Sequence, residues 1–249
     1  MQQEEILVRS TLDGTLQPSL LYRAEGKRPL LVGLHTWSFD RFNQVNNMLP
    51  WAEKCGFHLL LPQFRGPNLV SNPQNREACG SLLAKQDVID AIDHLVAEGI
   101  ADPENIFLLG NSGGGHMALL LAGYRPEYFK AIGAFVPITD LKKWAEENPK
   151  YRSHVLACCN EDEEQMLLRS PCHYKENILK ANLKIFHGKY DQVVPVSQSL
   201  TLYADLMAMD PQARVFLDIF DGGHQLDMSQ AMYWLLSQYK GKELVQITG

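Results

Sequence analysis

Ser112 lies among four glycines in the stretch FLLGNSGGGHMALLL, residues 107–121. Glycine costs backbone entropy on folding, so a cluster of glycines marks a sharp bend or a close approach of two backbones. The apolar run before the cluster has the pattern of a buried strand, and the run after it has the pattern of a helix. A hydroxyl at such a turn projects above the edge of a sheet, where an ester can reach it. The pattern predicts a nucleophilic serine on a tight turn, with Gly110 and Gly114 providing clearance.

The main alternative for this stretch is a phosphate-binding glycine loop. A dinucleotide fingerprint belongs at the first strand-to-helix turn of its domain, and a P-loop needs a lysine directly before its serine or threonine. Here the turn follows roughly the fifth predicted strand, and Asn111 directly precedes Ser112. Both differences favour the nucleophile, and a plain helix start is the other alternative.

A serine hydroxyl becomes a good nucleophile only when a base takes its proton and an acid orients that base. In hydrolases that carry the serine on a strand-to-helix turn, the chain order is serine, acid, histidine. His224 in FDGGHQL fits this order, since its glycine-flexed loop lies after the last predicted strand and before the last helix. His116, one helical turn beyond Ser112, is expected to pack beneath it, and His187 ends a strand. We therefore predict His224 as the base.

The acid is predicted from the loop that follows the strand in IFHGKYDQVVP. A carboxylate at Asp191 can hold the second imidazole nitrogen and stabilise the imidazolium form. Asp140 in VPITDL follows the preceding strand and is the rival, because some hydrolases take their acid from that strand. Asp218 and Asp221 lie too close to His224 in sequence for an easy approach.

Two backbone N–H groups are expected to stabilise the oxyanion of the tetrahedral intermediate. Gly113 begins the predicted helix, so its N–H has no partner within that helix and favours negative charge. The second donor is expected in the loop LVGLHTWSFD, from the amide of Thr36 or Trp37. The Trp37 ring is expected to wall the acyl pocket, and Trp37 and Asn111 are the predicted substrate-binding residues.

These residues need elements that carry them to one edge of a sheet. The clearest helical pattern spans 82–99, and a last helix is predicted over 226–240. Nearly continuous apolar runs predict strands whose two faces are both covered, at 28–35, 57–63, 105–110, 131–137, 183–188 and 214–220. Two earlier runs around Asp13-Gly14 predict an antiparallel hairpin. The alternation predicts an α/β fold with a mostly parallel central sheet of about eight strands flanked by helices.

No linker, repeat or low-complexity tract divides the chain, so residues 1–249 are predicted to form a single catalytic domain. The longest stretch without a predicted strand is 139–181, which is charged, helical in pattern and interrupted by Pro149 and Pro171. We expect it to lie as a lid-like helical insertion over one end of the sheet. Together with the loop at 64–80, it is expected to line the pocket.

Composition argues against several classes of protein. The formal net charge is −6 and no lysine–arginine cluster appears, which argues against a nucleic-acid partner. No run reaches the ~18 apolar residues of a membrane span, and the N-terminus has neither a signal nor a transit pattern. The five cysteines at irregular spacing favour free thiols in a reducing compartment, so the expected localisation is cytoplasmic.

A metal-binding interpretation of HVLACCN and PCHYK is disfavoured. The candidate ligands are His154, Cys158, Cys159, Cys172 and His173, and their spacing lacks the paired CxxC knuckles of structural zinc sites. Cys158 and Cys159 fit partly buried apolar positions on a helix. A serine–acid–histidine mechanism needs no metal or other cofactor, so none is predicted.

Taken together, these segments resemble the α/β-hydrolase superfamily, and within it the prolyl-oligopeptidase-like branch. The resemblance covers most of residues 5–240 and rests on LLVGLHTWSFD, LPQFRGPN, QDVIDAIDHL, GNSGGGHMALLLAGYRPEYFKA, HGKYDQVVPV and DGGHQ. It implies a catalytic triad of Ser112, Asp191 and His224. It also implies an oxyanion hole formed by the amides of Trp37 and Gly113.

This chain departs from the family pattern in two ways. The family loop often reads His-Gly-Gly or His-Gly-Tyr, whereas this chain has His35-Thr36-Trp37, so the first oxyanion donor stays open between Thr36 and Trp37. Peptidases of this branch also carry a large N-terminal propeller domain, which these 249 residues do not supply. The expected activity is therefore that of a serine carboxylesterase, hydrolysing short-chain acyl esters or sugar and aromatic acyl esters through an acyl-enzyme.

The alternative that uses the same triad is an exopeptidase or amidase of the prolyl oligopeptidase type, acting on small peptides. The acidic run at 161–164 could grip a free amino terminus, although such a run also fits a solvated helix face. A non-catalytic binding protein of the same fold is the third alternative, and the complete triad argues against it. The expected partner is a small-molecule ester, with no nucleic acid and no membrane, and a homo-oligomer is left open.

Overall fold

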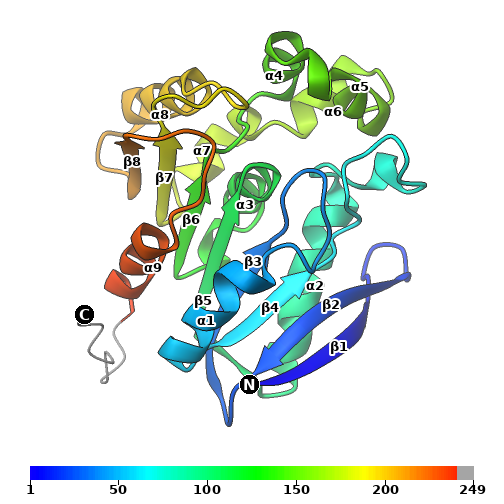
Figure 1. The fold of residues 1–249 in the computed structure, drawn as a ribbon, viewed down its shortest axis with the longest axis vertical. Coiled ribbons are helices and arrows are strands. Elements are labelled where there is room, and N and C mark those ends of the chain that lie inside the picture. The colour runs from blue at the N-terminus through cyan, green and yellow to red at the C-terminus, as the bar shows by residue number, and fades with distance from the viewer. Residues whose placement is uncertain (240–249) are drawn as a thin grey trace.

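The structure of the protein is a computed structural model that describes residues 1–239 (Figure 1). Residues 240–249 lie outside the described part, and they hold the end of the helix expected over 226–240 and the end of the expected domain. The strands are β1 (Gln2–Arg9), β2 (Leu16–Arg23), β3 (Arg28–Leu34), β4 (His58–Pro62), β5 (Ala101–Asn111), β6 (Ala131–Phe135), β7 (Leu183–Gly188) and β8 (Val215–Phe220).

The strands form one eight-stranded sheet in the order β1-β2-β4-β3-β5-β6-β7-β8. Strand β1 pairs antiparallel with β2, and β2 pairs antiparallel with β4. The other neighbouring strands are parallel, from β4–β3 through to β7–β8. The prediction of a mostly parallel α/β sheet with antiparallel N-terminal strands is confirmed.

The α-helices of the described residues are α1 (Val45–Cys55), α2 (Leu82–Ala97), α3 (Gly113–Tyr124), α4 (Leu141–Glu147), α5 (Pro149–Cys158), α6 (Glu163–Leu168), α7 (Lys175–Ile178), α8 (Ser197–Met209) and α9 (Met228–Ser237). Short 3-10 helices lie at η1 (Asn75–Glu77), η2 (Pro126–Tyr128) and η3 (Pro171–Tyr174). Helices α1 and α9 cover one face of the sheet, and α2, α3 and α8 cover the other (Figure 1).

Covering both faces explains why the strands are apolar almost without interruption. In β3, Leu30 and Val32 belong to the core beneath α2 and α3, while Leu31 belongs to the core beneath α1 and α9. A strand that buries alternate side chains in two cores needs apolar residues at every position. The parallel arrangement also brings the carboxyl ends of β3, β5, β6, β7 and β8 to one edge, where ligand sites of such sheets lie.

Two predicted strand boundaries differ from the structure by two residues or more, and the others agree to within one residue. Strand β5 begins at Ala101 and not at residue 105, because Ala101 pairs with Arg28 across an irregularity in the register with β3. Strand β6 ends at Phe135 and not at residue 137, because Val136 turns the backbone with a φ of 41°. Both deviations come from local backbone geometry that an apolar pattern does not encode.

Residues 139–181 form α4, α5, α6, η3 and α7, with no strand among them. Helices α4, α5 and α6 lie at the top of Figure 1, beyond the carboxyl ends of the strands. Pro149 and Pro171 each occupy the first turn of a helix and so begin elements where the sequence suggested breaks. No helix within residues 1–239 is both long enough and apolar enough to cross a membrane.

Candidate active site

Ser112 stands at the junction of β5 and α3 with a left-handed φ of 55°. A side-chain-bearing residue rarely adopts this conformation, which costs of order 1–3 kcal/mol and persists only where its surroundings enforce it. The surroundings here are backbone atoms. A Cβ on Gly110 would lie 2.2 Å from the Gly114 carbonyl oxygen, and one on Gly114 would lie 2.6 Å from the Leu34 carbonyl oxygen. The flanking glycines therefore allow the turn to close.

Three loops bring Ser112, Asp191 and His224 together at this edge. His224, between β8 and α9, places Nε2 at 2.9 Å from Ser112 Oγ. Its Nδ1 lies 2.7 Å from Oδ2 of Asp191, which follows β7. An ionised carboxylate only accepts, so Nδ1–H donates to Asp191 and Nε2 is left to accept from the serine hydroxyl. The arrangement can move a proton from Ser112 to His224.

The carboxyl of Asp191 is built to stay ionised. Its Oδ1 accepts from the backbone N–H groups of Val193 at 2.8 Å and Val194 at 2.9 Å. Burial alone raises its pKa, but hydrogen bonds from His187, His224 and the Val194 amide outweigh that effect and hold the pKa of Asp191 well below its usual range. A permanent negative charge beside the His224 ring stabilises the imidazolium form.

None of the other candidate acids is bonded to His224, and two of them are engaged elsewhere. Asp140 caps α4 by accepting from the Lys143 backbone N–H at 3.0 Å. Asp218 pairs with Lys184 at 3.1 Å, and the side chain of Asp221 is exposed.

The other two candidate histidines are buried and engaged as well. His116 lies against the Arg169 carbonyl at 2.7 Å, and burial lowers the pKa of His116 to about 4. His187 is a contact of the acid that the sequence interpretation missed. Its Nδ1 lies 2.7 Å from Ser199 Oγ, and its Nε2 lies 3.4 Å from Asp191 Oδ2. Its spacing of four residues from Asp191 was the available signal.

The structure separates the two candidate oxyanion donors. The Thr36 N–H donates to Asn43 Oδ1 at 3.1 Å and is therefore occupied. Within residues 1–239, no acceptor lies in hydrogen-bonding position for the N–H of Trp37 or of Gly113. A Cβ on Gly113 would lie 2.5 Å from the Trp37 nitrogen, so the two backbones are in contact. Trp37 and Gly113 thus present two open N–H groups beside Ser112.

The Trp37 ring lies deeper than expected for a pocket wall. It is 2% exposed and packs edge-on against Trp144, with ring centroids 4.8 Å apart. It shares a buried cluster with residues of α4, α5 and the segment before α2. Its Nε1 is buried without a hydrogen-bond partner within the described residues. Asn111, the other predicted substrate-binding residue, is half-buried, and its Oδ1 accepts from Gln44 Nε2 at 2.9 Å.

The cysteine- and histidine-rich segments form no metal centre in the described part of the chain, where no group of three or more His, Cys, Asp or Glu residues could hold an ion. Instead, Cys158 and Cys159 are buried in the Trp37 cluster with Cys79. The neighbouring Cys158 and Cys159 thiols, together with burial, raise the pKa of the Cys79 thiol well above its usual range. The three thiols join α5 to the segment between η1 and α2.

The acidic run at 161–164 belongs to the start of α6. Asp162 caps that helix through the Glu164 backbone N–H at 2.8 Å, and Glu163 pairs with Lys142 at 2.8 Å. All four side chains are exposed. These contacts are those of a solvated helix end.

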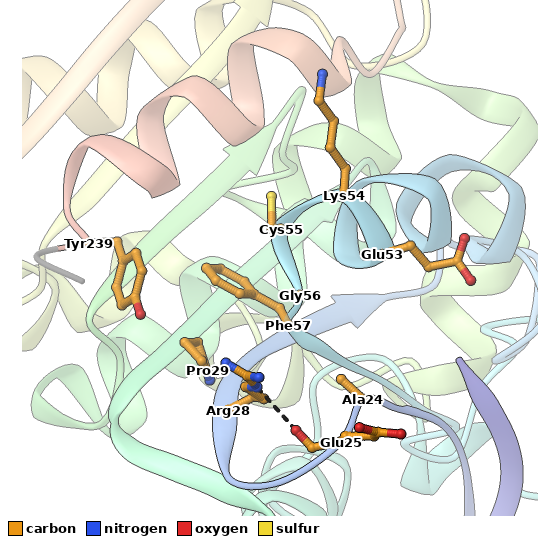
Figure 2. A pocket seen from close by; sticks show the side chains of 10 residues that line it. All are labelled: Ala24, Glu25, Arg28, Pro29, Glu53, Lys54, Cys55, Gly56, Phe57 and Tyr239. Carbon is orange, nitrogen blue, oxygen red and sulfur yellow. Dashed lines mark hydrogen bonds between the residues drawn. The ribbon is translucent and has the colours of Figure 1, made fainter. Parts of the chain in front are cut away.

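A surface pocket of about 540 Å³ lies away from this site (Figure 2). Its walls come from the turn between β2 and β3, the end of α1 and Tyr239, with Cys55 and Phe57 among the lining residues. Arg28 Nε donates to the Glu25 carbonyl oxygen at 3.0 Å along its floor. Arg28 begins β3, so the pocket lies at the edge of the sheet opposite the strand ends that carry the triad.

Comparisons with known proteins place these observations in context. The sequence model of the prolyl oligopeptidase family matches residues 45–240. An acylamino-acid-releasing enzyme of Arabidopsis thaliana is 29% identical over 215 residues, which cover 81% of this chain and 27% of that protein. The enzyme of the same name from Mus musculus is 30% identical over 184 residues, which cover 66% of this chain and 24% of that protein. The chain spans about a quarter of the length of these curated relatives.

Solved structures show the same architecture. An acylaminoacyl peptidase in complex with Z-Gly-Gly-Phe-chloromethyl ketone superimposes with a TM-score of 0.70 and 23% identity, over 90% of this chain and 37% of that one. A putative dipeptidyl aminopeptidase IV from Bacteroides ovatus gives a TM-score of 0.78 and 17% identity, over 95% of this chain and 36% of that one. At such identities the likeness shows the fold alone.

Proposed function

The chain belongs to the prolyl oligopeptidase family, and on that premise we propose that it is a serine peptidase that cleaves short peptides through an acyl-enzyme. The observation that supports this proposal most strongly is the pair of hydrogen bonds that connects Ser112 to His224 and His224 to Asp191. The relatives named above are acylamino-acid-releasing enzymes, which supports the peptidase alternative over the carboxylesterase expected from the sequence.

The proposed first step is attack of Ser112 Oγ on the scissile carbonyl carbon. His224 Nε2 takes the hydroxyl proton, and Asp191 keeps the imidazole in the required tautomer and stabilises its cationic form. The N–H groups of Trp37 and Gly113 donate to the oxygen that becomes negatively charged. His224 then returns the proton to the leaving amine, and a water molecule activated by the same base hydrolyses the acyl-enzyme.

We propose peptides with a blocked amino terminus as the favoured substrates. A free amino terminus is cationic and calls for an unpaired carboxylate near the site. Two of the four side chains in the acidic run that could have served are engaged elsewhere, since Asp162 caps its own helix and Glu163 pairs with Lys142. An N-acylated residue carries no such charge. The relatives described above are acylamino-acid-releasing enzymes by name, which supports the same class of substrate.

The test compares the wild type and Ser112→Ala on three sets of chromogenic substrates: N-acetyl-aminoacyl nitroanilides, free aminoacyl nitroanilides, and nitrophenyl esters from acetyl to decanoyl. We expect serine-dependent turnover of the acetylated anilides, with kcat/KM at least about tenfold above the free anilides, the loss that follows when a charged group meets a site without a counter-charge. Turnover of esters alone would return the assignment to an esterase. If none of the three substrate sets is turned over and a fluorophosphonate does not label Ser112, the proposal that the protein is a serine hydrolase is contradicted.

A further inference from the structure

A chain of side-chain hydrogen bonds joins the loop after β3 to the turn that carries Ser112. The Thr36 N–H donates to Asn43 Oδ1 at 3.1 Å. Gln44 Nε2 donates to that same oxygen at 3.0 Å and to Asn111 Oδ1 at 2.9 Å. The chain therefore begins one residue before one proposed oxyanion donor and ends one residue before the nucleophile.

Only one orientation of these amides is consistent with the bonds. The Thr36 N–H can only donate, so Asn43 must turn its oxygen toward it. Gln44 must then present its NH₂ group to Asn43, and the second hydrogen of that group reaches the Asn111 oxygen. The remaining Gln44 oxygen accepts from Asn47 Nδ2 at 2.9 Å. One backbone N–H thus fixes the direction of the whole bridge.

Gln44 occupies a position where a different side chain would serve the helix better. It immediately precedes α1 as its N-cap residue, and its side chain makes no capping bond. Serine, threonine, asparagine or aspartate at an N-cap stabilises a helix by about 1 kcal/mol relative to residues that do not cap. Gln44 is only 2% exposed, and its amide is directed into the bridge. Helix stability therefore does not account for this side chain.

We propose that Gln44 is a positioning residue that sets the spacing of the oxyanion hole, an inference that rests on the proposed function. Contact between the Gly113 and Trp37 backbones limits how closely the two donors approach. The bridge through Gln44 limits how far they separate. Because Asn43 also holds the Thr36 N–H, the loop can present only the Trp37 N–H to the reacting oxygen. The bridge supplies the constraint on a loop that has Thr36 and Trp37 where related loops often carry glycine.

The test uses two acidic variants of almost unchanged size. Gln44→Glu removes both donated hydrogens, since a carboxylate only accepts, whereas Asn43→Asp keeps the accepting oxygen that Thr36 and Gln44 need. Asn46→Ala, an exposed change in the first turn of α1, is the matched control. Each variant is assayed for kcat and KM on an N-acetyl-aminoacyl nitroanilide. Each is also assayed for the Ki of the corresponding peptide aldehyde, whose tetrahedral adduct places its oxygen in the hole.

We expect Gln44→Glu to lower kcat and to raise the aldehyde Ki by the same factor, roughly tenfold to a hundredfold, since misplaced donors weaken binding of the tetrahedral state. Its KM should stay within about twofold of the wild type, because the hole acts on the transition state. Asn46→Ala should stay within about threefold in all three constants. Asn43→Asp keeps the accepting oxygen of the bridge but adds a charge, so it should lose clearly less than Gln44→Glu. Gln44→Met, which also removes the bridge but adds no charge, should reproduce Gln44→Glu.

A Gln44→Glu enzyme that matches the wild type would overturn the positioning role, as would one in which KM rises as much as the aldehyde Ki. Equal losses in Gln44→Glu and Asn43→Asp would point to added charge and also contradict it. Thermal unfolding midpoints show whether each variant is folded. If Gln44→Glu does not fold, the kinetic constants of Gln44→Met test the positioning role in its place. If the wild type shows serine-dependent turnover but the Gln44 variants lose no activity, the positioning role is overturned and the proposed function stands. A wild type that neither turns over nor labels with a fluorophosphonate overturns both.

Discussion

Several segments of this molecule hold a non-glycine residue at positive φ. Two of them do so by clearly different means. Ser112 has a φ of 55° and Arg65 a φ of 66°. Backbone contacts among glycines enforce the conformation at Ser112. Arg65 is held by its own side chain, which is fully buried and forms ion pairs with Asp87 at 2.6 Å, Asp13 at 2.9 Å and Glu77 at 2.6 Å.

The difference shows how a strained residue can be either reactive or structural. At Ser112 the turn needs nothing from the hydroxyl, which is free to take part in chemistry. At Arg65 every nitrogen of the guanidinium is bonded, joining the turn between β1 and β2 to η1 and α2. Damage to the first segment should therefore appear as lost activity, and damage to the second as lost stability.

The largest expected effect is on the triad. Asp191→Asn should keep the fold and lower kcat by about 10⁴-fold, the loss seen when a triad acid cannot hold the correct tautomer. Steady-state kinetics on the acetylated anilide measure it. Asp140→Asn is the control, because asparagine also caps a helix and the change should alter neither kcat nor the unfolding midpoint. If Asp140→Asn instead abolishes turnover, the acid has been misassigned.

The second prediction concerns Arg65 and the stability of the folded protein. Arg65→Met leaves the Asp87 carboxylate buried without a partner, which should lower the free energy of unfolding by about 3–5 kcal/mol. Urea unfolding measures the loss, and kcat of the protein that stays folded should change little. Arg125→Met removes the exposed pair with Glu127 and should cost less than about 1 kcal/mol. Equal losses in the two variants would show that the buried network is not special.

A third prediction concerns pH and the buried His116 beneath Ser112. Burial lowers the pKa of His116 from 6.5 to about 4 in the folded state. Between these values the unfolded chain binds the proton and the folded chain does not, so stability is full above pH 6.5 and falls as pH drops toward 4. At 1.36 kcal/mol per pH unit the loss approaches about 3 kcal/mol. His116→Gln should flatten the slope in urea unfolding between pH 7 and 4.5, and an unchanged slope would assign it to other groups.

The smallest expected effect measures the backbone strain at the positive φ of Ser112. Ser112→Gly should abolish turnover and raise the free energy of unfolding by about 1 kcal/mol, because glycine adopts this φ without the steric cost. Ser112→Ala should abolish turnover as well, while leaving stability near the wild-type value, since alanine keeps the Cβ. Differential scanning calorimetry of the two variants makes the comparison. A Ser112→Gly protein no more stable than Ser112→Ala would mean that the turn stores little strain.

The sequence predicted the sheet and the family, and both are confirmed. Buried parallel strands are apolar at every position, and the glycines around Ser112 have no other simple explanation than a tight turn. The structure brings Ser112, Asp191 and His224 within hydrogen-bonding distance of one another as expected. Chain order was informative because loops that follow neighbouring parallel strands meet at one edge of the sheet.

Other features depend on contacts that no local pattern records. The choice between Thr36 and Trp37 as donor depends on the side chain of Asn43, which accepts the Thr36 N–H. The Arg65 network joins residues 52 and 22 positions away in the chain. The preference for an ester over a peptide rested on the propeller domain of related peptidases, whereas the acylamino-acid-releasing relatives support the peptide alternative better. A triad attacks both bonds, so its residues alone do not distinguish the two substrates.

The three buried thiols offer a way to time motion at the site. Cys79 precedes α2, whereas Cys158 and Cys159 lie at the end of α5, and none of the three is more than 1% exposed. A thiol reagent can modify them only when the helices above the strand ends separate from the body of the domain, because buried thiols are otherwise unreactive. The rate at which the reagent modifies the three thiols therefore reports how often these helices open. The measurement does not depend on catalysis by Ser112.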